Sequence, residues 1–343
     1  MANQKFRVGI TRDALRDDGK TVFDAAALRV LDDPLIEWEF IPENVKELTA
    51  SHAASYDALC VLSPRTTAAT LAGPNRRLKI VARLGVGYDN VDVPACTASG
   101  VLLTITPDGV RRPVATSILT FILSLSHKLF LKDRITRAGR WGETKFHMGE
   151  GLVGKTVGSI GMGNIGSELL RLLAPLNMNL IACDPAKTQA DADPLGVKLT
   201  DMDTVLRESD FVCVNCFLSE QTRGLVGERE LALMKPSAYL INTARGPIVN
   251  EAALYKVLSD KRIAGAALDV FEHEPASGDN PLFKLDNIIV TPHSICWTDE
   301  CFRGNAEGAF RAAVAVAKGE TPKYIVNTDV LLHPDIKTQL KLG

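Results

Sequence analysis

A glycine-rich segment, GSIGMGNIG at 158–166, most constrains the fold that this chain can adopt. It lies between an apolar, strand-like segment, TVGSI, and an amphipathic, helix-like segment, SELLRLLAPL. In a G-x-G-x-x-G pattern, the first glycine allows a tight turn, the second lets the backbone approach a pyrophosphate, and the third brings helix and strand together. The amino terminus of the helix then faces the anion. This context predicts a dinucleotide-binding unit rather than a plain strand–turn–helix.

A carboxylate follows at the spacing typical of such a unit. Asp184 ends the next strand-like segment, eighteen residues after Gly166, close to the ~20 residues at which an acidic side chain reaches the ribose 2′-hydroxyl. Its charge would repel a 2′-phosphate, although Lys187 is a contrary signal, so the pattern favours NAD over NADP. The cofactor-binding candidates here are Gly161, Met162, Gly163, Asn164, Ile165, Gly166 and Asp184.

Two blocks of the chain alternate strand-like segments with helix-like stretches such as DAAALRVLDD and ENVKELTASHAA. Such alternation is typical of parallel sheets that are covered by helices on both faces. The strand-like segments are FRVGI, WEFI, DALCVL, KIVARLG and VLLTI, then TVGSIG, NLIAC, FVCVNC, AYLIN, AGAALD and NIIVT. The predicted fold is α/β with two doubly wound parallel-sheet domains. A Rossmann domain at 105–296 is inserted into a flavodoxin-like substrate-binding domain at 1–104 and 297–343, to which the last helix returns.

A long apolar stretch joins the two blocks. Its apolar positions recur at helical spacing over 114–131, and Pro113 suits the first turn of a helix. Because this helix is apolar on several sides, we expect it to underlie both blocks, and one face could be buried in a dimer.

Net charge and hydropathy exclude several classes of protein. A formal charge of −2 at pH 7 gives no electrostatic footprint for nucleic acid or an anionic membrane. No apolar run approaches the ~20 residues that cross a bilayer, and the opening residues, MANQKFRVGI, show no signal-peptide pattern. We therefore expect a cytoplasmic protein that binds neither nucleic acid nor membranes.

The seven cysteines are odd in number and scattered, which is typical of reduced thiols in a cytoplasm. Cys213 and Cys216 formally make a C-x-x-C pattern, for which a redox or zinc site is the alternative. They lie in a strand-like segment, where residues three apart face opposite sides, and no second cysteine pair completes a zinc set. We favour buried thiols and predict no metal site.

Three chemically active side chains follow apolar segments of the second block. Arg245 ends AYLINTARG, Glu274 lies in IAGAALDVFEHEP, and His293 ends NIIVTPH. Since ligands of an open α/β sheet bind beyond the carboxyl ends of its strands, these groups are expected to converge beside the dinucleotide. A guanidinium can fork onto a carboxylate, and an imidazole can move a proton near neutral pH. The set suits hydride transfer to or from a 2-hydroxy acid.

Taken together, these motifs resemble the D-isomer-specific 2-hydroxyacid dehydrogenase family, which includes phosphoglycerate dehydrogenases, hydroxypyruvate reductases and D-lactate dehydrogenases. The resemblance covers roughly 55–325. It is carried by LGVGYDNVD at 84–92, GSIGMGNIGSEL at 158–169, SEQTRGLVGERELALMKPSAYLINTARGPIVNEAAL at 219–254, IAGAALDVFEHEP at 263–275 and TPH at 291–293. It implies an NAD-dependent oxidoreductase that acts on the CH–OH group of a small D-2-hydroxy acid or on its 2-keto partner.

The resemblance also assigns roles to the active side chains. Arg245 matches the family's catalytic arginine, which would bind the substrate carboxylate and polarise the C2 oxygen. His293 matches the acid/base histidine, and Glu274 the acidic residue that orients it and raises its pKa. Asp269 matches the aspartate beside the nicotinamide amide. Thr243 and Ala244, next to Arg245, are further cofactor-binding candidates.

Two loops of the first block match the family's substrate side. The segment Gly85-Val86-Gly87 can aim backbone N–H groups at an anion, so Val86 and Gly87 are substrate-binding candidates, with a simple glycine turn as the alternative. Ser63 and Arg65 end the preceding strand and could contact the distal part of the substrate, although a solvated loop is nearly as well supported.

Some positions depart from the family pattern. Trp297 closes a Ser-Ile-Cys-Trp segment after His293, where small residues are usual, and Phe217 replaces a usual proline beside the cofactor. Arg111 and Arg112 hint at an anionic substrate tail.

Two alternative functions follow from relatives with this fold: a non-catalytic NAD(H) sensor that acts as a co-repressor, and an enzyme that oxidises formate or phosphite. In the family, the region after 114 builds a homodimer, which we expect here with Trp141 near the contact.

Overall fold

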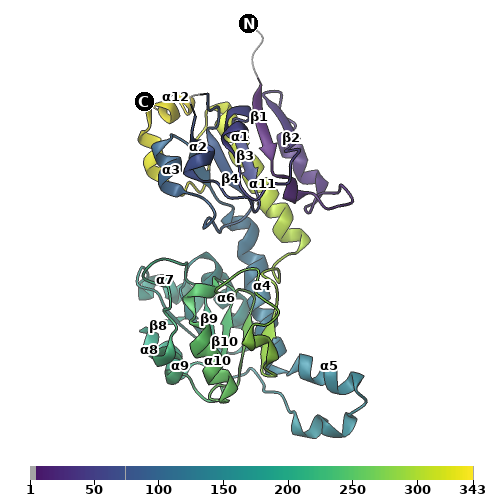
Figure 1. Cartoon of the computed structure of the whole chain (residues 1–343). Coiled ribbons are helices and arrows are strands. Elements are labelled where there is room, and N and C mark those ends of the chain that lie inside the picture. The colour runs from purple at the N-terminus through teal and green to yellow at the C-terminus, as the bar shows by residue number, and fades with distance from the viewer. Residues whose placement is uncertain (1–4, 74, 343) are drawn as a thin grey trace. The chain divides into compact units, whose positions relative to one another are not determined.

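The computed structural model describes residues 5–73 and 75–342, and Figure 1 labels its helices and strands. The chain forms two compact units, Met1–Val110 with Trp297–Gly343, and Arg111–Cys296. It passes from the first unit to the second inside helix α4 (Pro107–Ser126) and returns just before helix α11 (Asp299–Lys318). Residues 1–4, on which part of the signal-peptide prediction rests, lie outside the described residues.

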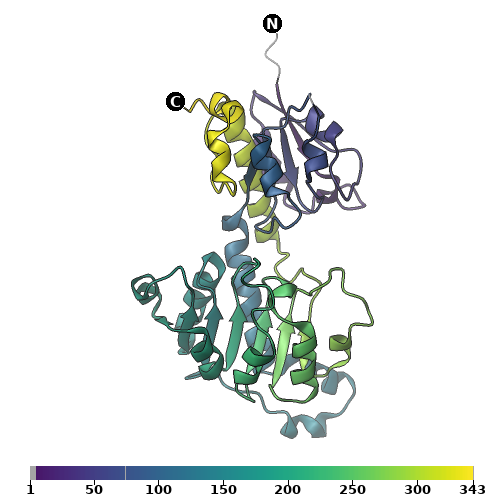
Figure 2. The ribbon, with the colours of Figure 1, turned by 60° about the vertical axis from the view of Figure 1, so that its left-hand side comes forward.

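The first unit is built on a five-stranded parallel sheet in the order β2–β1–β3–β4–β5, which is the order of flavodoxin-like folds. Helix α11 packs against β3 and β4 and supplies Phe310 and Ala313 to the core on one face; Figure 2 shows it beside the sheet. Helices α1, α2 and α3 cover the other face. The strands are β1 (Phe6–Ile10), β2 (Ile36–Phe40), β3 (Ala58–Val61), β4 (Ile80–Arg83) and β5 (Leu102–Thr104). The helices are η1 (Arg12–Ala14), η2 (Ala25–Leu31), α1 (Ala50–Ser55), α2 (Ala68–Leu71), α3 (Val93–Ala98), η8 (Thr328–Leu332) and α12 (Pro334–Gln339).

The second unit contains a seven-stranded parallel sheet in the order β12–β11–β10–β9–β6–β7–β8. The order reverses between β6 and β9, as in a Rossmann fold, so the predicted fold class is confirmed. Helices α4 and α6 pack on one face, and α8, α9 and α10 on the other. The strands are β6 (Thr156–Ile160), β7 (Asn179–Cys183), β8 (Lys198–Leu199), β9 (Phe211–Val214), β10 (Tyr239–Asn242), β11 (Gly265–Leu268) and β12 (Ile288–Val290). The helices are α5 (Leu129–Arg137), η3 (Trp141–Phe146), α6 (Asn164–Leu173), η4 (Ala174–Leu176), α7 (Gln189–Ala192), η5 (Asp193–Leu195), α8 (Met202–Glu208), α9 (Glu228–Leu233), η6 (Gly246–Ile248), α10 (Glu251–Ser259) and η7 (Pro281–Lys284).

The prediction of one helix over 114–131 is wrong at both ends. Helix α4 begins at Pro107, so Pro113 lies in its interior, where it removes the amide that would bond to the Gly109 carbonyl. Helix α4 ends at Ser126, and Lys128 takes a left-handed backbone conformation, with φ of 52°, before α5 begins. The apolar periodicity therefore runs through two helices that are separated by a turn.

No single helix in the described residues is long and apolar enough to cross a membrane, whereas the bent pair α4 and α5 meets the criteria of length and composition when taken together.

Candidate active site

The glycine turn after β6 has the geometry that a dinucleotide needs. Gly161 has a φ of 99°, and a Cβ there would lie 2.8 Å from the backbone of Asn215, so only glycine fits. A Cβ on Gly166 would collide with the Gly161 carbonyl, which explains the close approach of α6. A Cβ on Gly163, by contrast, would meet no described atom within 4 Å. The first and third glycines therefore serve packing, and the second leaves space beside the amino terminus of α6 for a pyrophosphate.

Asp184 is hydrogen-bonded to this turn. Its Oδ2 accepts from the Met162 N–H at 2.8 Å, and its Oδ1 accepts from the Ala186 N–H at 2.9 Å. A carboxylate oxygen can accept more than one hydrogen bond, so both oxygens keep capacity for ribose hydroxyls. The residue thus ties the end of β7 to the glycine turn and remains half-buried at the edge of the sheet.

The turn that carries Arg245 follows β10 and is set by a buried asparagine. The Oδ1 atom of Asn242 accepts from the Ala244 N–H at 3.0 Å, and its Nδ2 donates to the Arg245 carbonyl at 3.0 Å. The guanidinium of Arg245 donates to the Ala244 carbonyl at 2.7 Å. A Cβ on Gly246 would collide with the Phe271 carbonyl, so this glycine lets the arginine turn pack against the loop that contains Glu274.

Glu274 and His293 form a direct pair. Glu274 Oε2 lies 2.6 Å from Nδ1 of His293, and its Oε1 accepts from the Phe271 N–H at 2.9 Å. The hydrogen bond to Glu274 raises the pKa of His293 above its usual value, although burial and the charge of Arg245 oppose it. Burial alone would raise the pKa of Glu274, but its hydrogen bonds and the charges of His293 and Arg245 lower it overall. The pair therefore combines an ionised carboxylate with a readily protonated imidazole.

Asp269 positions the histidine loop, a role that the sequence did not reveal. This residue is buried, and its Oδ1 accepts from Thr291 Oγ1 at 2.6 Å, the Ser294 N–H at 2.9 Å and the Ile295 N–H at 3.2 Å. His293 itself has a φ of 53°, which is costly for a non-glycine residue and persists only where surrounding contacts enforce it. The three bonds from the 291–295 loop supply that constraint. The TPH motif shows the histidine but not the aspartate that holds its loop from the end of the neighbouring strand, β11.

The substrate candidates Ser63, Arg65, Val86 and Gly87 lie in the first unit, after β3 and β4. The sequence missed Arg83, whose buried guanidinium donates to the Gly87 carbonyl at 2.9 Å, the Val61 carbonyl at 2.9 Å and the Leu62 carbonyl. Arg83 thereby links the glycine loop to the loop that contains Ser63. The side chain of Arg65 is exposed. The remaining cofactor candidates, Thr243 and Ala244, lie between the end of β10 and Arg245 in the second unit.

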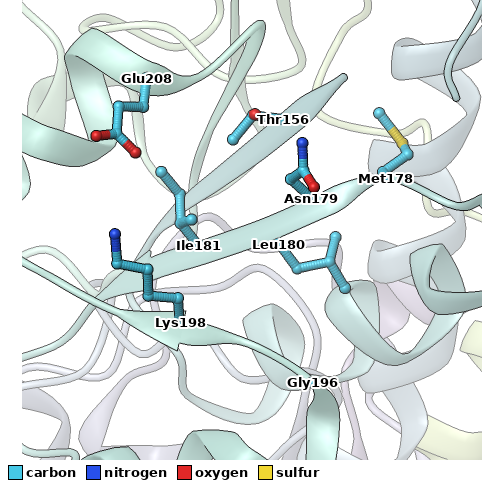
Figure 3. Close-up of a pocket in the computed structure, with 8 residues that line it drawn as sticks. All are labelled: Thr156, Met178, Asn179, Leu180, Ile181, Gly196, Lys198 and Glu208. Carbon is cyan, nitrogen blue, oxygen red and sulfur yellow. The ribbon is translucent and has the colours of Figure 1, made fainter. Parts of the chain in front are cut away.

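A pocket of about 400 Å³ lies in the second unit, away from this set. Figure 3 shows the residues that line it. Its lining includes Thr156 and Asn179, which begin β6 and β7, together with Lys198 and Glu208. It therefore lies at the amino edge of the sheet, whereas ligands of this fold bind at the carboxyl edge. Within residues 5–73 and 75–342, no group of three or more histidine, cysteine, aspartate or glutamate side chains could hold a metal ion.

Known proteins resemble this chain over most of its length. Residues 119–294 match the family described as "D-isomer specific 2-hydroxyacid dehydrogenase, NAD binding domain". A glyoxylate reductase of Thermofilum pendens is 37% identical over 84% of this chain and 86% of its own length. A D-3-phosphoglycerate dehydrogenase of Archaeoglobus fulgidus is 39% identical over 79% of this chain, which spans about half (51%) of that protein.

The similarity extends to a solved structure. A glyoxylate reductase from Paecilomyes thermophila superposes with a TM-score of 0.81 at 26% identity, covering 94% of this chain and 99% of that chain. The glycine turn, with its open space at Gly163, fits the cofactor that this family binds. The chain therefore belongs to the D-isomer specific 2-hydroxyacid dehydrogenase family and is an NAD-dependent oxidoreductase that acts on the CH–OH group of a 2-hydroxy acid or reduces the corresponding 2-keto acid.

Proposed function

We propose that this enzyme reduces a small, unbranched 2-keto acid of the glyoxylate type, and that Arg245, Glu274 and His293 carry out the reaction. The observation that carries the proposal is the Glu274–His293 pair at the carboxyl edge of the cofactor-binding sheet. Because Nδ1 of His293 is engaged by Glu274, Nε2 is the nitrogen left to face a substrate. Several relatives at this level of similarity are glyoxylate reductases, which supports a short substrate.

Each side chain has a defined task in this proposal. The bound cofactor would supply the hydride that reduces carbon C2 when it is NADH, and would accept that hydride in the reverse direction when it is NAD. His293 gives its proton to the C2 oxygen during reduction and takes it from the hydroxyl during oxidation. Glu274 keeps the imidazole oriented and protonated, and Arg245 forks onto the substrate carboxylate.

We assign the cofactor to the carboxyl edge of the second unit. Gly161, Met162, Gly163, Asn164, Ile165 and Gly166 would surround the pyrophosphate, Asp184 would accept from the ribose hydroxyls, and Thr243 and Ala244 would border the nicotinamide half. Asp269 uses Oδ1 for the histidine loop, and no described donor bonds to its Oδ2. That oxygen is therefore suited to accept a hydrogen bond from the nicotinamide amide.

The first unit, in this proposal, binds the substrate through the N–H groups of Val86 and Gly87, with Ser63 and Arg65 toward its distal part. Arg83 holds this loop through the Gly87 carbonyl. The division into a substrate-binding domain at 1–104 and 297–343 and a cofactor-binding domain at 105–296 is part of the same proposal.

The assembly that we propose is a homodimer. Large apolar side chains are exposed along and beyond α5, namely Leu129, Phe130, Trp141, Phe146, Met148 and Val153. Figure 1 shows this arm projecting from the rest of the second unit. Monomeric proteins rarely expose apolar groups so close together, and a second copy of the chain would cover them.

All seven cysteines are free thiols, which supports a cytoplasmic location.

The deciding experiment is steady-state NADH oxidation with a panel of 2-keto acids. Glyoxylate and three-carbon 2-keto acids are expected to give the largest kcat/KM, ahead of phosphorylated, dicarboxylic and branched ones. A preference for a phosphorylated or dicarboxylic acid would contradict the short-substrate assignment. Absence of turnover with every member would contradict the assignment of this site to 2-keto acid reduction.

A further inference from the structure

Phe217 is an exposed aromatic residue at the edge of the sheet that holds the cofactor-binding candidates. It lies on the loop after β9, and it is 76% exposed. The strand order reverses between β6 and β9, and ligands of doubly wound sheets bind in the crevice at such a point. The ring therefore stands on one of the two loops that border the crevice.

The backbone that carries this ring is held in place on both sides. The Asn215 N–H donates to the Ile160 carbonyl at 2.8 Å, and the backbone of Asn215 leaves no room for a side chain at Gly161. Beyond the ring, the carbonyl of Phe217 accepts from Thr222 Oγ1 at 2.7 Å. The backbone that carries the phenyl group is thus held beside the glycine turn.

The same loop reaches toward the Asp184 end of the site. A Cβ on Gly161 would lie 2.8 Å from the backbone nitrogen of Cys216. The Gly161 N–H in turn donates to the carbonyl of Cys183 at 2.8 Å, one residue before Asp184. Arg245 and His293 follow β10 and β12, on the other side of β9. The loop after β9 therefore borders the adenosine half of the site.

We propose that the phenyl ring of Phe217 is a cofactor-binding face on which the adenine of NAD stacks. The inference rests on the placement of NAD given under the proposed function. Bases stack on aromatic side chains in offset geometry, and this contact needs only the flat π-face of the ring. An adenine in this position would also cover a ring that the chain itself leaves in water.

Calorimetric titration of the full chain with AMP, ADP-ribose and nicotinamide mononucleotide tests this assignment. Phe217→Ala is expected to weaken AMP and ADP-ribose binding by about tenfold, with nicotinamide mononucleotide unchanged. Phe217→Leu keeps an apolar side chain but loses the flat aromatic ring, so it should lose most of the affinity for AMP and ADP-ribose. Phe217→Tyr keeps the ring and should retain that affinity. Leu332→Ala, which removes an equally exposed apolar side chain (71%) in the first unit, is the matched control.

The outcomes separate this proposal from the one on which it rests. Equal AMP affinity in the wild type and Phe217→Ala would overturn the stacking role alone. An equal loss for AMP and nicotinamide mononucleotide would also overturn it, because the ring would then act on both halves of the site. A wild-type chain that bound no ADP-ribose would refute the placement of NAD itself, and the stacking role with it.

Discussion

Glu274 Oε2 lies 2.6 Å from Nδ1 of His293, and this contact controls the charge of the imidazole. The hydrogen bond raises the pKa of His293, while the pKa of Glu274 is lowered overall. The protonated form of the histidine therefore persists to higher pH than in a free imidazole, which favours reduction of a 2-keto acid near neutral pH.

Glu274→Gln removes the carboxylate charge, so the pKa of His293 is expected to fall. Reduction needs the protonated imidazole, which is lost as the pH rises through this pKa. The descending limb of the reduction rate against pH should therefore move to lower pH, with part of the activity kept. Profiles of kcat/KM for the two proteins would measure the shift, with Glu208→Gln at the opposite edge of the sheet as control. An unmoved limb would contradict the pairing.

His293→Ala removes the proton donor and acceptor. Turnover is expected to fall by about 10²–10⁴-fold, because the variant lacks the imidazole that donates the proton to the C2 oxygen or accepts it. NADH affinity, measured by fluorescence titration, should stay close to that of the wild type, since the glycine turn lies elsewhere on the sheet edge. Near-normal turnover in the variant would refute the assignment of His293.

Arg245→Lys keeps a positive charge but loses the planar guanidinium that can donate two parallel hydrogen bonds to a carboxylate. A charge-assisted hydrogen bond contributes ~1.5–3 kcal/mol, so kcat/KM should fall by about tenfold or more. Lysine also cannot hold both the Ala244 carbonyl and a substrate carboxylate in one plane. Steady-state kinetics with the best 2-keto acid would decide, and wild-type behaviour of the lysine variant would exclude bidentate recognition.

The exposed apolar arm predicts a dimer in solution. Light scattering of the wild type at micromolar concentration should give twice the chain mass of 37.1 kDa. Trp141→Glu places a charge among the exposed apolar side chains of the arm and should shift the mass toward the monomer, whereas Leu332→Glu in the first unit should not. A monomer mass for the wild type would refute the proposed assembly.

Asp184 predicts a strong preference for NAD over NADP. The carboxylate can accept from ribose hydroxyls and meets a 2′-phosphate as a like charge, so we expect a ratio in kcat/KM of about 10² or more, a difference of ~2.7 kcal/mol. Asp184→Ser should erode this preference, mainly by weakening NAD and relieving repulsion of NADP. The serine variant also loses a hydrogen bond from the Met162 or Ala186 N–H. Asp184→Asn, which removes the charge but keeps an acceptor, separates this effect from the loss of charge. Equal use of both cofactors by the wild type would show that Asp184 does not face the ribose.

The strands and the cofactor turn could be predicted because their signals are local. Apolar runs of four or five residues mark the buried strands, and the spacing of Gly161, Gly163 and Gly166 describes one turn. The two-residue strand β8 was missed because it is too short to show a period. The predicted helix over 43–54 is helical only from Ala50, because residues 46–48 pair with Arg65 in extended form. That pairing is non-local and overrides local propensity.

The sequence by itself determined the fold class and which side chains gather at the strand ends, since strand direction and motif spacing suffice for both. Only the tertiary structure decided how those side chains are held. The three hydrogen bonds to Asp269 and the contacts of Arg83 with the Val61 and Leu62 carbonyls join segments that are distant in the chain. Such contacts leave no period and no motif, because they depend on where packed strands bring their loops rather than on the order of residues within any one of them.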